Sequence, residues 1–179
     1  MEFINKLETT IGGWIKNVPH LPVAGQKWLA ENVWWLALIG AILTAISLLF
    51  AIGGLFTLIA LLGAVSSVYY VAGAGVTGWS ILAAVIALVF AVIQGILLAV
   101  AIKPLKAMQK KGWVILFLGW LLNILSVVIS AVVSGSVFGF ISGILFGAIG
   151  IAISGYFLYE IHGQFAHVVK AKSTKAKKA

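Results

Sequence analysis

The chain has 179 residues, of which 63% are hydrophobic and 9% are charged, against about 25% charged residues in soluble globular proteins. Its charged residues are confined to 1–31, 103–111 and 160–179, and it contains no Cys, Asp or Arg. This composition excludes a soluble globular domain, disulfides, thiolate chemistry and guanidinium binding of phosphate. A transmembrane helix needs about 20 apolar residues, so the uncharged stretches 32–102 and 112–159 predict a polytopic membrane protein.

The first predicted element is an amphipathic helix. Apolar side chains recur at helical spacing from Phe3 to Val18, with polar side chains on the opposite face. Pro19 and Pro22 should end this helix, because proline disfavours the helical conformation in the residue before it. We expect residues 1–32 to form an N-terminal segment whose helix lies in the membrane interface. The alternative is a helix packed against the transmembrane helices of the same chain.

The transmembrane helices follow, and the sequence predicts an all-α polytopic membrane domain over residues 33–159. As one helix, residues 33–72 would measure about 60 Å, roughly twice the thickness of the hydrocarbon core, so we expect a turn at Gly53 and Gly54. Five transmembrane helices result, at about 33–52, 55–72, 79–102, 113–134 and 137–159. If residues 55–72 do not cross the bilayer, the alternative count is four.

Tryptophans and tyrosines near the predicted helix ends are expected to anchor the helices at the lipid headgroups, where such rings are enriched. These anchors are Trp14, Trp28, Trp34, Trp35, Trp79, Trp113, Tyr69, Tyr70, Tyr156 and Tyr159.

Lysines follow the third and the fifth predicted transmembrane helices, in the loop 103–112 and in the tail 160–179. By the positive-inside rule both segments are cytoplasmic. We expect a bacterial inner membrane, disorder in the last ten residues 170–179 and, with five crossings, an external N-terminus. The expected partners are the bilayer and its anionic lipids, a second copy or a membrane complex, and no nucleic acid. The lysines expected at the headgroups are Lys103, Lys106, Lys110, Lys111, Lys170, Lys172, Lys175, Lys177 and Lys178.

Small residues recur at every fourth position on the last two predicted helices. They are Gly135, Gly139, Gly143 and Gly147, preceded on the other helix by Ser126 and Ser130. Such a strip on one helix face lets another backbone approach closely and drives helix association in lipid. We expect the glycine strip to dock these two helices on each other, or the last helix on a second copy of the chain.

Gln94 and Asn123 are the two amides at depth in the predicted transmembrane helices. A buried amide in lipid forms an interhelical hydrogen bond, so we expect these residues to join the third and fourth predicted helices. The alternative is a polar lining for a small neutral solute.

Ionisable side chains gather at the end of the last predicted helix and are missing at depth, so proton relays and embedded acid catalysis lack their residues. Glu160, His162, Gln164 and His167 provide at most a partial metal site, and we expect no metal and no cofactor. Glu160 is expected to pair with Lys170 or a loop lysine, and His20 to be a solvated loop residue.

The sequence favours a non-catalytic packing, scaffold or assembly component of a membrane, with the glycine strip as its helix interface. The alternative is a small channel or carrier for a neutral or weakly polar solute. The two differ in water access, because a pore needs a continuous polar surface across the bilayer. We do not expect an enzyme, because a serine nucleophile would have no His or Lys at its own depth to activate it.

Overall fold

The computed structural model of the chain describes residues 2–15, 18–65, 78–133 and 137–176. Within these ranges the protein is helical and has no strand. The helices are α1 (Glu2–Ile15), α2 (Val23–Val65), α3 (Gly78–Lys106), α4 (Lys110–Val133) and α5 (Val137–Ala176).

Four of these helices are long and apolar enough to cross a membrane. The candidate spans in the described residues are Val23–Leu61, Ile81–Lys106, Lys110–Val133 and Val137–Phe165. The prediction of an all-α helical membrane protein is therefore confirmed, with the alternative count of four crossings rather than five.

The turn predicted at Gly53 and Gly54 is wrong, because α2 continues through both residues. A helix broken inside hydrocarbon would leave backbone N–H and C=O groups unpaired at a cost of several kcal/mol. Two glycines inside a helix cost only about 1 kcal/mol each. The Thr57 hydroxyl also donates a hydrogen bond to the Gly53 carbonyl oxygen at 3.0 Å. Of the predicted second span, residues 66–72 lie outside the described residues.

The prolines do separate two helices, since α1 ends at Ile15 and α2 begins at Val23. The predicted spans 79–102 and 113–134 correspond to α3 and α4. The tail differs from its prediction of disorder, because α5 continues to Ala176. Ile161 and Phe165 are buried, which favours helix beyond residue 159, and the Ala and Lys residues that follow are strong helix formers.

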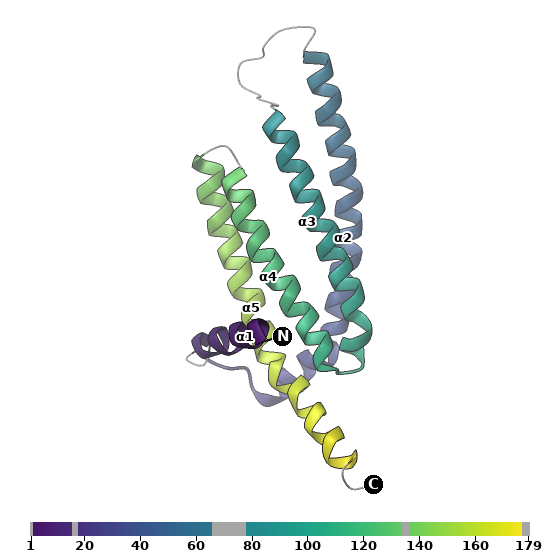
Figure 1. The fold of residues 1–179 in the computed structure, drawn as a ribbon, viewed down its shortest axis with the longest axis vertical. Helices are drawn as coiled ribbons and strands as arrows, with labels where there is room; N and C mark the ends of the chain where they lie inside the picture. The colour runs from purple at the N-terminus through teal and green to yellow at the C-terminus, as the bar shows by residue number, and fades with distance from the viewer. Residues whose placement is uncertain (1, 16–17, 66–77, 134–136, 177–179) are drawn as a thin grey trace.

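The helices pack in chain order as two antiparallel hairpins, α2 with α3 and α4 with α5, joined through residues 107–109. We call the end of the bundle at this connection the basic end, because Lys103, Lys106, Lys110 and Lys111 surround it. Away from the basic end the two hairpins diverge, as Figure 1 shows. Helix α1 lies across α5, and the segment between α1 and α2 runs beside α5 toward the basic end (Figure 1).

The connection at the basic end is tight. Met108 has a positive φ of 50°, which lets the chain reverse direction in three residues. A Cβ on Gly112 would lie 2.7 Å from the backbone nitrogen of Leu105. Only glycine therefore lets the start of α4 approach the end of α3 this closely.

The buried core lies near the basic end rather than in the middle of the bundle. Its largest fully buried side chains are Trp113, Phe117, Phe165, Leu105 and Ile161. Leu7 and Ile11 of α1 pack against this core, while Lys6 and Thr10 on the other side of α1 are exposed. Helix α1 thus packs on its own chain, and its position in a membrane interface stays a prediction.

Candidate functional site

Two tryptophans of α4 hold α5 through hydrogen bonds to its backbone. The indole N–H of Trp113 donates to the Leu158 carbonyl oxygen at 2.8 Å, and that of Trp120 donates to the Ile151 carbonyl oxygen at 3.0 Å. Both the donors and the acceptors are seven residues apart, so they lie along one line of contact between antiparallel helices. We call this line the α4–α5 seam.

Glycines of α5 lie on the same seam. A Cβ on Gly147 would lie 2.3 Å from the Val127 side chain, and one on Gly155 would lie 2.7 Å from the Trp120 ring. Gly143 is farther from α4, with Ala131 at 3.9 Å. The structure thus brings these glycines to α4 of the same chain.

The other members of the predicted strip are less buried in the α4–α5 seam or lie outside the described residues. Ser126 is half-buried and Ser130 is exposed. Gly139 is half-buried near the start of α5, and Gly135 lies outside the described residues. Association between copies of the chain through this strip stays a prediction.

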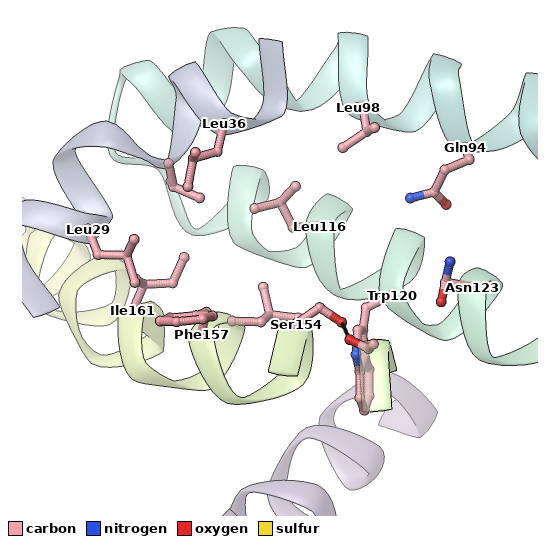
Figure 2. Close-up of a pocket in the computed structure, with 13 residues that line it drawn as sticks. Leu29, Leu36, Gln94, Leu98, Leu116, Trp120, Asn123, Ser154, Phe157 and Ile161 are labelled. Carbon is pink, nitrogen blue, oxygen red and sulfur yellow. Dashed lines mark hydrogen bonds between the residues drawn. The ribbon is translucent and has the colours of Figure 1, made fainter. Parts of the chain in front are cut away.

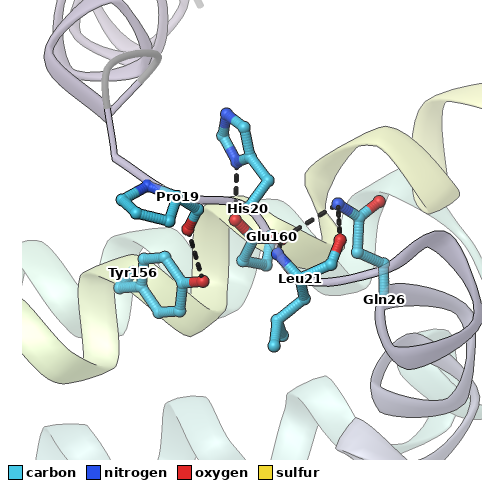
Figure 3. Close-up of polar contacts among 6 residues, drawn as sticks. All are labelled: Pro19, His20, Leu21, Gln26, Tyr156 and Glu160. Atoms are coloured by element: carbon cyan, nitrogen blue, oxygen red, sulfur yellow. Dashed lines mark hydrogen bonds and ion pairs between the residues drawn. The ribbon is translucent and has the colours of Figure 1, made fainter.

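Glu160 is the buried carboxylate of the protein's described part, with 4% of the residue exposed. Its Oε1 lies 2.7 Å from Nδ1 of His20, and its Oε2 accepts hydrogen bonds from the Leu21 backbone N–H at 3.0 Å and from the Gln26 amide at 2.9 Å. Figure 3 shows these donors converging on the carboxylate. The partners that the structure shows for Glu160 are therefore not loop lysines, and the expected pairing with Lys170 falls outside the described side chains.

The same contacts fix the segment between α1 and α2 on α5. The Tyr156 hydroxyl donates to the Pro19 carbonyl oxygen at 2.9 Å (Figure 3), one helical turn before Glu160. His20 is half exposed but bound through its ring nitrogen, so it is not a free solvated residue. We call Glu160, Tyr156 and their partners in residues 19–26 the N-terminal clasp.

The aromatic residues predicted to anchor the helices at the lipid headgroups differ in their exposure. Trp28 and Trp35 are exposed, with exposed fractions of 66% and 50%. Trp113 is fully buried, so its assignment as a headgroup anchor is wrong: it is stacked on Phe117 in the core. Tyr156 and Tyr159 are half-buried. The side chains of Trp14, Tyr69, Tyr70 and Trp79 lie outside the described residues.

The lysines of the 103–112 loop surround the basic end. Lys103, Lys106 and Lys111 are exposed and Lys110 is half-buried. The Lys106 ammonium lies 4.8 Å from the ring centroid of Trp34, a cation–π contact that ties the end of α3 to α2. The side chains of Lys170, Lys172, Lys175, Lys177 and Lys178 lie outside the described residues.

A pocket of about 540 Å³ lies between the two hairpins and is lined by all four long helices. Gln94 of α3 and Asn123 of α4 lie at one end of it (Figure 2). The Gln94 Oε1 atom is buried and accepts no hydrogen bond. The expected amide bond from Asn123 to this oxygen is therefore missing, although the Gln94 amide packs against Gly119 of α4.

Sequence reasoning missed His20, Gln26 and Trp120. Nothing in the sequence signals the clasp, because its partners are more than 130 residues apart. The seven-residue spacing of Trp113 and Trp120 is a signal that places both rings on one face of α4.

The described residues contain no group of three His, Cys, Asp or Glu side chains that could bind a metal ion. Glu160 and His20, two of the possible ligands, instead bind each other. Comparison of the chain with protein-family models, with curated proteins and with solved structures found no match.

Proposed function

We propose that the chain is a non-catalytic integral membrane protein that acts as a packing or assembly component. The observation that carries this proposal is the set of hydrogen bonds made by Glu160, the buried acid of the described spans. Its two oxygens are occupied by three donors from residues 20–26. A group held in this way has a structural role, so no free embedded acid remains there for catalysis or proton transfer.

The seam and the outer surfaces support the same proposal. Small residues and indole hydrogen bonds join α4 to α5, which is how helices associate where apolar contact alone gains little. Large apolar side chains cover the outside of the bundle, such as Phe50, Phe138 and Phe146 with exposed fractions of 77%, 83% and 72%. These surfaces are available to lipid or to a neighbouring protein.

We infer that the basic end faces the cytoplasm. Lysines of the 103–112 loop and the N-terminal clasp lie at this end, and the positive-inside rule favours this orientation. The exposed ammonium groups of Lys103 and Lys111 are then placed to attract anionic lipid headgroups at about 1 kcal/mol each.

Native mass spectrometry of the full chain, extracted from its own membrane in mild detergent, tests the assembly role. The expected result is a species of two or more chains, or one chain with a stable protein partner. A lone chain in the extract and in nanodiscs at high protein density would contradict the proposal.

A small carrier or pore for a neutral solute is the second candidate, and the placement of Gln94 and Asn123 at one pocket favours it. Because the chain has no cysteine, Gln94→Cys and Asn123→Cys give clean single sites for a water-soluble thiol reagent. Modification of both would support the pore. Protection of both, with Lys111→Cys reactive and Phe50→Cys protected as controls, would favour the assembly role.

A further inference from the structure

The pocket between the hairpins has one polar end and a long apolar remainder. In Figure 2, Gln94 and Asn123 lie at one end, and Leu29 and Ile161 at the other. Leucine side chains and Phe157 line the space between them. Its volume of about 540 Å³ is within the range of about 300–1,000 Å³ found for small-molecule sites.

This pocket opens sideways toward the bilayer. Leu36 of α2 and Phe157 of α5 line it, yet their exposed fractions are 55% and 44%. Helices α2 and α5 contact each other less extensively than the pairs within each hairpin. The buried core closes the bundle at the basic end. A molecule therefore reaches the pocket from the hydrocarbon between α2 and α5.

The chemistry of the lining defines the ligand. The described residues that line the pocket include no ionisable side chain, so a charged group would enter hydrocarbon without a counter-charge. The buried Gln94 Oε1 accepts no hydrogen bond, and a buried acceptor left unpaired is costly. It needs a donor such as a hydroxyl group. Asn123 at the same end offers a second amide, which can both donate and accept.

We propose that this pocket binds a neutral, lipid-soluble alcohol from the bilayer. Its hydroxyl group bonds to the side-chain amides of Gln94 and Asn123 at the polar end, and its hydrocarbon part lies between Leu36 and Leu98 on one side and Phe157 on the other. This site is independent of the assembly role, because it uses the gap between hairpins and not the outer surface of the bundle.

Photolabelling of the full chain in phosphatidylcholine nanodiscs tests the site. The probes are a diazirine-bearing dodecanol and the matching dodecane without the hydroxyl group, and labelled residues are mapped by mass spectrometry. We expect the alcohol to label the pocket residues Leu98, Leu116 and Phe157 about tenfold more than the alkane, the factor expected for one hydrogen bond made away from water. Excess unlabelled dodecanol should displace it.

Gln94→Leu should reduce labelling by the alcohol to the level of the alkane. Its melting temperature without alcohol should be no lower than that of the unmodified protein, because an unpaired acceptor is removed. Leu36→Trp should block labelling by both probes by filling the pocket. Phe50→Trp is the matched control, since Phe50 is 77% exposed on the same helix and does not line the pocket.

Two results would overturn the proposal. Equal labelling of the pocket by alkane and alcohol would mean that bulk hydrocarbon fills it without recognition of the hydroxyl group. A lower melting temperature of Gln94→Leu with unchanged labelling would mean that the amide joins helices and does not bind a ligand.

Discussion

At the scale of single residues, Glu160 is the side chain on which the N-terminal clasp depends. Burying a carboxylate costs several kcal/mol unless hydrogen bonds compensate it. Here both oxygens are compensated by groups from one short segment, residues 20–26. Pro19 and Pro22 keep the residues just before α2 out of a helix, which leaves the Leu21 backbone N–H available as a donor. The non-helical break between α1 and α2 therefore supplies a donor for the buried carboxylate, and the carboxylate in turn holds the break on α5.

Glu160→Leu should lower the free energy of unfolding by about 1–3 kcal/mol, because three donors lose their buried acceptor. Thermal unfolding of the protein in detergent measures this loss. Hydrogen exchange of the peptide that contains Leu21 should accelerate in the same variant, since its N–H would be exposed to water.

Glu31→Gln is the control for the loss of a negative charge at this end. Glu31 is half exposed and lies 4.0 Å from the Lys27 ammonium one helical turn away, and such exposed pairs contribute about 0.3–0.5 kcal/mol. Equal stability losses for Glu31→Gln and Glu160→Leu would show that the clasp contributes nothing beyond surface charge.

At the scale of helices, the α4–α5 seam combines close approach with polar bonds. Gly147 and Gly155 remove side-chain bulk where Val127 and Trp120 enter, and the two indole hydrogen bonds then reach the α5 backbone. The close approach and the hydrogen bonds depend on each other, because an indole N–H reaches a helix carbonyl only where no bulky side chain covers the backbone. The seam is thus specific in register.

Gly147→Ala should destabilise the protein by about 1–3 kcal/mol, the usual cost of overpacking, because its methyl group would lie 2.3 Å from the Val127 side chain. Gly150→Ala on the same helix meets no atom within 4 Å. This control should be neutral or gain up to about 1 kcal/mol from helix propensity. Melting temperatures in one detergent compare the two variants.

Adding Val127→Ala to Gly147→Ala should restore part of the lost stability, since it removes the atoms that clash. The two substitutions are in contact, so their effects should not be additive. A double variant no more stable than Gly147→Ala would mean that the cost arises elsewhere than at the seam.

Helix identity was predictable from the sequence, but helix continuity was not. Uncharged apolar stretches mark α3 and α4 because a bilayer permits only backbone that is internally bonded. The same rule keeps α2 intact through Gly53 and Gly54, where length alone predicted a turn. The sequence shows the seven-residue spacing of Trp113 and Trp120. It does not show which carbonyl oxygens accept their indole hydrogen bonds, because every residue carries a carbonyl group. Partners across more than 130 residues, such as His20 and Glu160, leave no local pattern.

At the scale of the whole molecule, packing is uneven along the bundle. The fully buried side chains gather near the basic end, and the hairpins diverge beyond it (Figure 1). Helices α3 and α4 join the two hairpins through extensive contacts, whereas α2 contacts α5 only weakly. The pocket with Gln94 and Asn123 lies on this boundary between the packed and the divergent parts (Figure 1), whereas the sequence offered only the two amides as a possible polar lining.

The count of four crossings has a direct consequence for topology. Residues 19–26 bind α5 near the basic end, so four crossings predict that the N-terminus and the 103–112 loop lie on one side of the membrane. This topology predicts all twelve lysines on that side, while the sequences 66–77 and 134–136 contain no charged residue. This distribution fully satisfies the positive-inside rule. Four crossings thus predict a cytoplasmic N-terminus, in place of the external one expected from five crossings.

A reporter active only in the cytoplasm, fused ahead of Met1, should therefore be active, and the same reporter fused after Ala179 is its control. A reporter inserted in 66–77 should be inactive, because this connection follows one crossing. Activity at the tail with none at Met1 would establish an odd number of crossings, and the clasp between residues 19–26 and α5 could not then form within one chain. Activity at both ends places the amphipathic α1 on the cytoplasmic surface, where anionic lipids attract its lysines.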